Sequence, residues 1–167
     1  MTTAPATEAR STEARAVDAW ARLLRGHSAT VRTLNAQLLR DHGLTINDYE
    51  ALLVLSYAEG EQLRRTDLAE SLQLTASGIT RLLDGLERAG FVAKRRCSED
   101  ARVSYAVLTS SGREKLAQAA CSHVAAITEL FGERFSGAEL ETLVALLGRL
   151  PGAQGGPDCA PAAAPDA

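Results

Sequence analysis

Two short amphipathic segments follow one another between Thr66 and Leu83, and this pattern constrains the fold more than any other in the chain. Apolar residues recur at helical spacing in both segments, with a break of a few residues between them. The inner faces would consist of Leu68, Ala69, Leu72, Ile79 and Leu82. Ala69 is small at a point where two helices must approach closely. The pattern predicts a helix-turn-helix.

A change of hydrophobic period comes directly after the second segment. Residues 91–96 are predicted to form a strand, 97–101 a polar turn, and 103–108 a return strand whose residues alternate at period two. A two-stranded ribbon after a helix-turn-helix is a wing. The expected fold class is therefore mainly α, with a winged helix-turn-helix domain at its centre.

The other segments show helical periodicity. Apolar residues from Val17 to Leu38 recur in steps of three and four, which predicts a long helix over about 13–40 that Gly43 ends. Five more helices are predicted over about 46–58, 67–72, 76–89, 112–135 and 137–150. Leu63 is expected in a short strand. The predicted element order is α-α-α-α-β-β-α-α.

Side chains that accept hydrogen bonds mark the expected helix starts. Capping boxes are predicted at Thr45–Asp48, Ser111–Glu114 and Ser136–Glu139, and single caps at Thr66 and at either Thr75 or Ser77. Gly85 departs from this regularity, since glycine in a helix interior costs about 1 kcal/mol relative to alanine. It either permits close packing or leaves the helix locally soft.

The chain is expected to have four parts. Residues 44–111 form the winged helix-turn-helix, while 13–43 and 112–150 form an all-helical dimerisation region from both chain ends. The apolar stripe of the first helix and the apolar faces of the last two helices exceed what one small core needs, which favours a second copy as partner. Residues 1–12 and the Pro/Gly-rich 151–167 are predicted to be disordered tails.

The second helix of the pair has an outer face suited to double-stranded DNA. Ser77, Gly78, Thr80 and Arg81 lie near its N-terminus, the part of a recognition helix that reads base edges. Arginine pairs with guanine in the major groove, short hydroxyls are adaptable, and glycine allows a close approach. At the wing tip, Arg102 is expected to enter the minor groove, with its guanidinium held by Asp100.

The ordered series of these motifs resembles the MarR family of winged-helix transcription regulators. The resemblance rests on Leu44-Thr45 and Tyr49, on the run from Leu68-Ala69 through Ile79–Leu83 to Gly90-Phe91, on Asp100 with Arg102, and on Leu108-Thr109 with Gly112. It covers about residues 15–150. It implies a homodimer that binds a pseudo-palindromic operator, usually as a repressor released by a small ligand. It also implies that Arg95 and Arg96 contact the DNA backbone.

The resemblance places an effector between the dimer helices and the winged lobe. Trp20, His27 and Tyr49 are the candidate ligand-binding residues, with Arg22 or Arg25 nearby. Trp20 in the first helix is also a feature of the urate-responsive branch of the family. The competing interpretation is that Trp20 packs in an interface and His27 is a satisfied core histidine.

The sequence also allows other functions. A thiol-redox sensor would use Cys97, which follows two arginines, and a ligand- or protein-binding module would have kept the fold without DNA binding. Cys121 and His123 with His42 suggest zinc only weakly, because i,i+2 spacing puts side chains on different helix faces. No nucleophile–base pair or phosphate-binding loop is apparent, so neither an enzyme nor a cofactor or metal is predicted.

The net charge of −3 conceals an uneven distribution. Residues 75–113 contain seven basic and four acidic side chains, whereas 133–167 contain two basic and five acidic ones. Binding depends on the local field, so an acidic chain can still bind DNA through its basic segment. No apolar run approaches the ~20 residues needed to span a bilayer, and no secretory signal is apparent, so a cytoplasmic location is expected.

Overall fold

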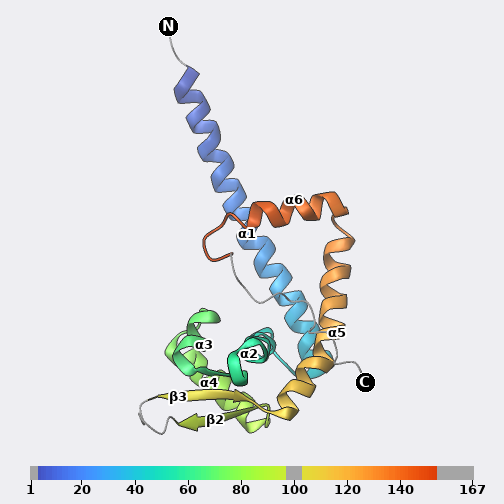
Figure 1. Cartoon of the computed structure of the whole chain (residues 1–167). Helices are drawn as coiled ribbons and strands as arrows, with labels where there is room; N and C mark the ends of the chain where they lie inside the picture. The colour runs from blue at the N-terminus through green and yellow to red at the C-terminus, as the bar shows by residue number, and fades with distance from the viewer. Residues whose placement is uncertain (1–3, 97–102, 154–167) are drawn as a thin grey trace.

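A helical frame supports a small winged lobe at one end of the molecule (Figure 1). The computed structural model describes residues 4–96 and 103–153. The frame consists of α1 (Ala4–His42), α5 (Ser110–Gly132) and α6 (Gly137–Leu147). The lobe consists of α2 (Ile46–Tyr57), the 3-10 turn η1 (Glu59–Glu61), β1 (Gln62–Arg64), α3 (Arg65–Ser71), α4 (Ala76–Arg88), β2 (Val92–Arg96) and β3 (Ser104–Leu108). The predicted order of helices and hairpin is confirmed.

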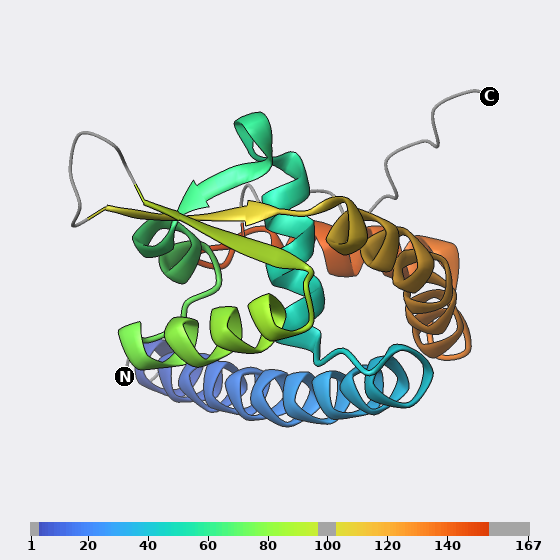
Figure 2. The same ribbon diagram turned by 90° about the horizontal axis from the view of Figure 1, so that it is seen from below.

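The sheet of the lobe is antiparallel, with strand order β1-β3-β2. The hairpin pairs Val92 with Leu108 at one end and Arg96 with Ser104 at the other. The short strand expected at Leu63 is present as β1, and it pairs with β3. The sheet contacts α2 and α4 (Figure 2). This packing fixes the position of the wing relative to the helix-turn-helix.

Local signals in the sequence set several helix ends. The Thr45–Asp48 and Ser136–Glu139 capping boxes are both formed. Thr75, one of the two alternatives, caps α4 by accepting a hydrogen bond from the Gly78 N–H at 3.1 Å. Gly43 ends α1 with a φ of 67°, a conformation that glycine adopts without steric cost.

Three predicted helix starts were wrong. Helix α1 begins at Ala4, so part of the predicted disordered tail 1–12 is helical; its alanines favour helix, and Pro5 is tolerated in a first turn. Thr66 lies inside α3, which begins at Arg65 without a side-chain cap. Helix α5 begins at Ser110 with Thr109 as its cap, instead of the expected Ser111.

Thr109 joins the wing to α5. Its hydroxyl accepts from the Gly112 N–H at 3.0 Å and donates to the Gly90 carbonyl at 2.7 Å. Its own N–H donates to the Phe91 carbonyl at 3.1 Å. A Cβ on Gly112 would lie 2.1 Å from that Phe91 oxygen, closer than atoms can approach. The chain passes from hairpin to helix so tightly that only glycine fits there.

The core lies around α2, which packs against the other elements of the lobe and against α1 and α5 of the frame. Its fully buried side chains include Leu38 of α1, Leu52 and Leu55 of α2, Leu68 of α3 and Leu83 of α4. The predicted apolar stripe of α1 therefore divides in two. Its C-terminal part enters this core, whereas Val17, Trp20 and Leu24 stay exposed.

Among residues 4–96 and 103–153, no helix is long and apolar enough to cross a membrane. Within the same ranges, no group of three or more His, Cys, Asp or Glu side chains is placed to hold a metal ion.

Candidate nucleic-acid interface

The first turns of α4 present an open polar face. Ser77 and Arg81 are both exposed, and their i,i+4 spacing puts them on the same side of the helix. Arg81 makes no hydrogen bond or ion pair with any described residue, so all its donors are available to a ligand. The opposite side of α4 carries Ile79, Leu83 and Leu86, which are buried and hold the helix against the core.

Gly78 and Thr80 are less open than the sequence suggests. The Thr80 hydroxyl donates to the Ala76 carbonyl at 2.7 Å, inside its own helix. A Cβ on Gly78 would lie 3.2 Å from Thr75 Oγ1, so this glycine also gives room to the helix cap. Arg65, at the start of α3, brings its Nη1 within 3.5 Å of Thr80 Oγ1. Arg65 therefore adds a cation beside α4 that the sequence analysis missed.

The cations of β2 have different environments. The Arg95 guanidinium lies over the ring of its cross-strand partner Tyr105, 5.1 Å from the ring centroid, and donates to Gln62 Oε1 of β1. Such stacking orients the planar group and leaves its outer donors free. Arg96 is exposed and has no ion-pair partner among the described residues. Asp100 and Arg102 of the predicted wing tip lie outside the described residues.

Lys94 differs from its two neighbours. Its Nζ lies 2.6 Å from Asp84 Oδ1 and 2.9 Å from Glu87 Oε2, both on α4. The hydrogen bond from Lys94 holds the pKa of Asp84 below its ordinary value. Reciprocally, the hydrogen bonds to Asp84 and Glu87 raise the pKa of Lys94. The lysine is thus fully charged and its charge is balanced within the chain.

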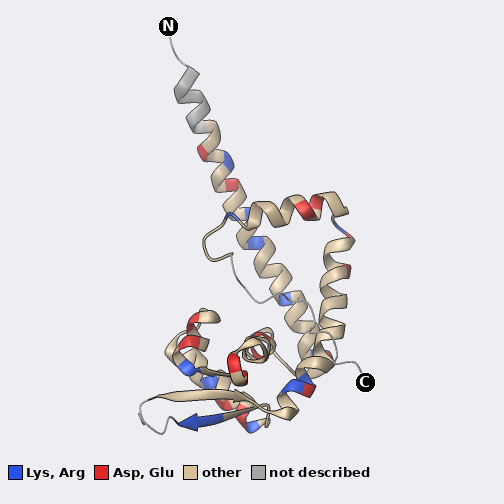
Figure 3. Cartoon of the chain, viewed as in Figure 1, with Lys and Arg blue, Asp and Glu red and all other residues tan. Residues whose placement is uncertain are grey.

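The basic residues of the lobe and of the start of α5 differ in whether an acidic side chain holds them. Figure 3 shows where the basic and acidic residues lie along the ribbon. Arg113 is bound by Glu61, with its Nε 2.8 Å from Oε1, and Lys94 is bound by the two carboxylates of α4. Arg81, Arg95 and Arg96 have no acidic partner within the described part of the chain. Arg65 and Arg88 also have no ion pair among the described residues, although Arg88 donates a hydrogen bond to the Asp84 carbonyl. The cations without an acidic partner thus include those at the start of α4 and at the far end of β2.

The candidate ligand residues are not brought together. A cleft of about 570 Å³ lies between α1, α2 and the turn after α3, with His27 and Glu50 among its polar lining residues. Its apolar lining residues are Val31, Ile46, Leu53, Val54 and Leu72. Tyr49 instead is buried on the other side of α2 against His123, and Trp20 is exposed about two turns before His27.

The residues of the alternative zinc site are not brought together either. Cys121 is exposed, whereas His123 is buried, as expected for i,i+2 positions on one helix. His42 Nε2 lies 2.6 Å from Ser122 Oγ. Cys97, the candidate redox residue, lies outside the described residues.

Comparisons with known proteins agree with this geometry. A family model described as MarR family matches residues 42–103. The HTH-type transcriptional repressor YetL of Bacillus subtilis (strain 168) is 36% identical over 108 residues, which are 65% of this chain and 64% of YetL. The chain covers only 46–50% of the length of the next curated relatives.

Solved structures show the same similarity over more of the chain. AbsC, a MarR family transcriptional regulator from Streptomyces coelicolor, is 35% identical with a TM-score of 0.65, over 74% of this chain and 86% of AbsC. Sco3205 from the same organism, a MarR family transcriptional regulator solved in complex with DNA, is 28% identical with a TM-score of 0.73. That match covers 80% of this chain and 83% of Sco3205.

Proposed function

This chain belongs to the MarR family of winged helix-turn-helix transcription regulators, and we propose that it is a homodimeric repressor that binds a pseudo-palindromic DNA operator and is released by a small ligand. The observation that carries this proposal is the positive charge of Arg81, Arg95 and Arg96, which have no acidic partner among the described residues. These residues stand on the two elements that the fold offers to a duplex, the start of α4 and the end of the wing.

The proposed binding mode uses both grooves. The start of α4 enters the major groove, where Arg81 and Ser77 read base edges. Arg95 and Arg96 contact phosphates beside the groove, and Arg102, supported by Asp100, enters the minor groove. Gly78 and Thr80 lie in the same turns of α4. Gly78 allows close approach to the DNA and gives room to the helix cap, and the Thr80 hydroxyl already donates within its own helix.

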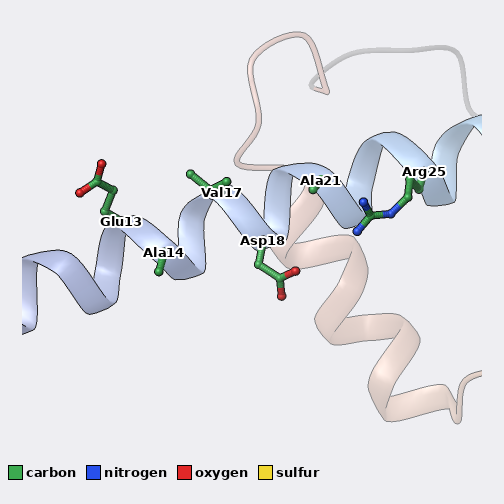
Figure 4. A pocket seen from close by; sticks show the side chains of 6 residues that line it. All are labelled: Glu13, Ala14, Val17, Asp18, Ala21 and Arg25. Carbon is green, nitrogen blue, oxygen red and sulfur yellow. The ribbon is translucent and has the colours of Figure 1, made fainter.

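Exposed apolar side chains at the other end of the molecule support a homodimer. Val17 and Trp20 of α1 are 62% and 59% exposed, and Val144 of α6 is 72% exposed. Figure 4 shows the hollow along this part of α1, whose described lining residues, from Glu13 to Arg25, all come from that one helix. A second copy would cover these faces and set two α4 helices about one helical turn of DNA apart, roughly 34 Å.

The cleft between α1, α2 and the α3–α4 turn is the proposed effector site. Its walls come from the frame and from the lobe, and its lining residues Ser71, Leu72 and Gln73 lie directly before α4. Gln73 has a φ of 52°, which is uncommon for a residue other than glycine. A ligand in this cleft would contact the segment that sets the direction of the recognition helix. His27 lines this cleft, whereas Tyr49 does not line it and would affect a ligand only indirectly, through the core in which it is buried.

A binding-site selection with the full chain and random duplexes tests the proposal. We expect an inverted repeat, with affinity for it falling steeply with salt, at about 0.9 log units per phosphate contact for each log unit of salt. An Arg102→Ala variant should bind the selected duplex more weakly. If no sequence is enriched and any DNA binding is independent of salt, the proposal is refuted. That result would favour a ligand- or protein-binding module that does not bind DNA.

A further inference from the structure

We infer that Lys94 is a positioning residue of the recognition helix and not a contact to DNA. Sequence alone groups it with Arg95 and Arg96 as one basic run. The structure separates it from them, because its ammonium is bound to two carboxylates of α4. This inference rests on the proposed function, since it assigns a role within DNA binding.

The register of the sheet explains the separation of Lys94 from Arg95. Side chains alternate between the faces of a strand, so Val92, Lys94 and Arg96 share one face of β2 and Arg95 lies on the other. Arg96 lies two residues farther along that face and has no ion pair among the described residues. Val92 is buried on the side of the helices, and Lys94 follows it toward α4. There, Asp84 and Glu87 stand at i,i+3 on one helix face. Without the lysine, these two carboxylates would repel each other.

Gly85 shows why α4 needs such a bridge. A Cβ at this position would meet no atom of the described residues within 4 Å, so close packing within this part of the chain is not the reason for a glycine here. The alternative interpretation, a locally weak helix, remains, because glycine is a poor helix former. Asp84 precedes this weak point and Glu87 follows it within one turn. Lys94 therefore ties both sides of Gly85 to the wing, which keeps Arg81 and Ser77 on a straight helix.

A positioning residue and a phosphate contact have different signatures in DNA binding. A lost phosphate contact weakens binding to every duplex alike and lowers the salt slope by about one. A misplaced recognition helix instead weakens only the reading of base edges. The ratio of operator affinity to non-specific affinity thus separates the two roles.

The experiment compares Lys94→Gln with Arg96→Gln in the full chain, by fluorescence anisotropy on the selected operator and on a scrambled duplex of equal length. We expect Lys94→Gln to lower operator affinity about threefold to tenfold, in line with two exposed ion pairs, with scrambled-duplex affinity and salt slope unchanged. Arg96 is on the same strand and has no ion pair in the described part of the chain. Arg96→Gln should therefore lower both affinities and the slope. A Lys94→Gln variant that behaves like Arg96→Gln overturns the inference.

Gly85→Ala provides a second measurement. If Lys94 compensates for a weak helix, Gly85→Ala in the Lys94→Gln background should restore most of the lost operator affinity, and Lys94→Arg should retain it. Amide hydrogen exchange without DNA should show faster exchange at 85–88 in Lys94→Gln, reversed by Gly85→Ala. Unchanged exchange there contradicts the inference. Failure of the wild-type chain to bind any duplex contradicts the proposed function instead, while the exchange result still stands.

Discussion

The ring of Tyr49 in α2 packs against the ring of His123 in α5, with centroids 4.7 Å apart and the planes tilted by 58°. Gln37 of α1 completes the contact, with its Oε1 3.4 Å from His123 Nδ1. The three residues come from the lobe and from two helices of the frame. This buried polar contact is therefore part of the joint through which the two regions are connected.

The burial of His123 in this contact predicts that the free energy of unfolding falls at mildly acidic pH. Burial, and next the charge of His42, lower the pKa of His123 below its ordinary value of 6.5. The unfolded chain then binds a proton at pH values where the folded chain does not, so the free energy of unfolding decreases as the pH falls from 6.5 through the folded pKa. Urea unfolding at pH 7 and at a series of lower pH values measures this decrease.

A His123→Gln variant serves as its control. Glutamine keeps a polar group near Gln37 and does not titrate, so the decrease between neutral and acidic pH should be smaller than in the wild type. Equal decreases in both proteins would show that His123 is not the group responsible.

Replacement of Arg81 by alanine should weaken operator binding by about 1–3 kcal/mol, because a bidentate pair with a base would be lost. The loss should be concentrated at one base position of each half-site, where the variant tolerates substitution. Anisotropy titrations against operators with single base changes measure both effects. Arg15→Ala, an exposed cation on the far part of α1, should bind like the wild type.

Introducing a charge into the exposed stripe of α1 should separate the dimer. Leu24→Asp places a carboxylate on this apolar face, at a residue that is 46% exposed in the single chain. The expected result in sedimentation equilibrium is a shift from twice the chain mass toward the 17.7 kDa of one chain. Arg22→Ala changes the neighbouring polar face, where Arg22 pairs with Asp18, and should leave the mass unchanged. A wild-type chain that is already monomeric would refute the proposed homodimer.

Gly112→Ala should destabilise the fold by about 1–3 kcal/mol or more, because the added methyl group meets the Phe91 carbonyl. Gly132→Ala in the same helix is the matched control, since a Cβ there meets no atom within 4 Å in the part of the chain that the structure describes. It should be neutral or stabilising by up to about 1 kcal/mol. Thermal unfolding of both variants measures the difference, and similar melting temperatures would contradict the tight passage between wing and α5.

The sequence predicted the local elements because their causes are local. Thr45, Thr75 and Gly43 act on backbone groups within a few residues, and the change of period after Gly90 marks the hairpin directly. The misplaced start of α5 has a physical reason. Ser111 and Thr109 both have hydroxyls suited to capping, and only the packing of the hairpin beside the helix selects Thr109.

The sequence by itself determined the family, the winged helix-turn-helix and the elements on which the DNA-contact candidates lie, since these follow from short-range periodicity and motif order. Tertiary structure decided which cations are free. Arg113 meets Glu61 and Tyr49 turns toward His123 in contacts between residues far apart in the chain, whereas Lys94 meets Asp84 and Glu87 across the short connection between α4 and β2. Such contacts depend on how the sheet packs against α4 and how α5 packs against α2. That packing is set by the whole core, so no single segment encodes it.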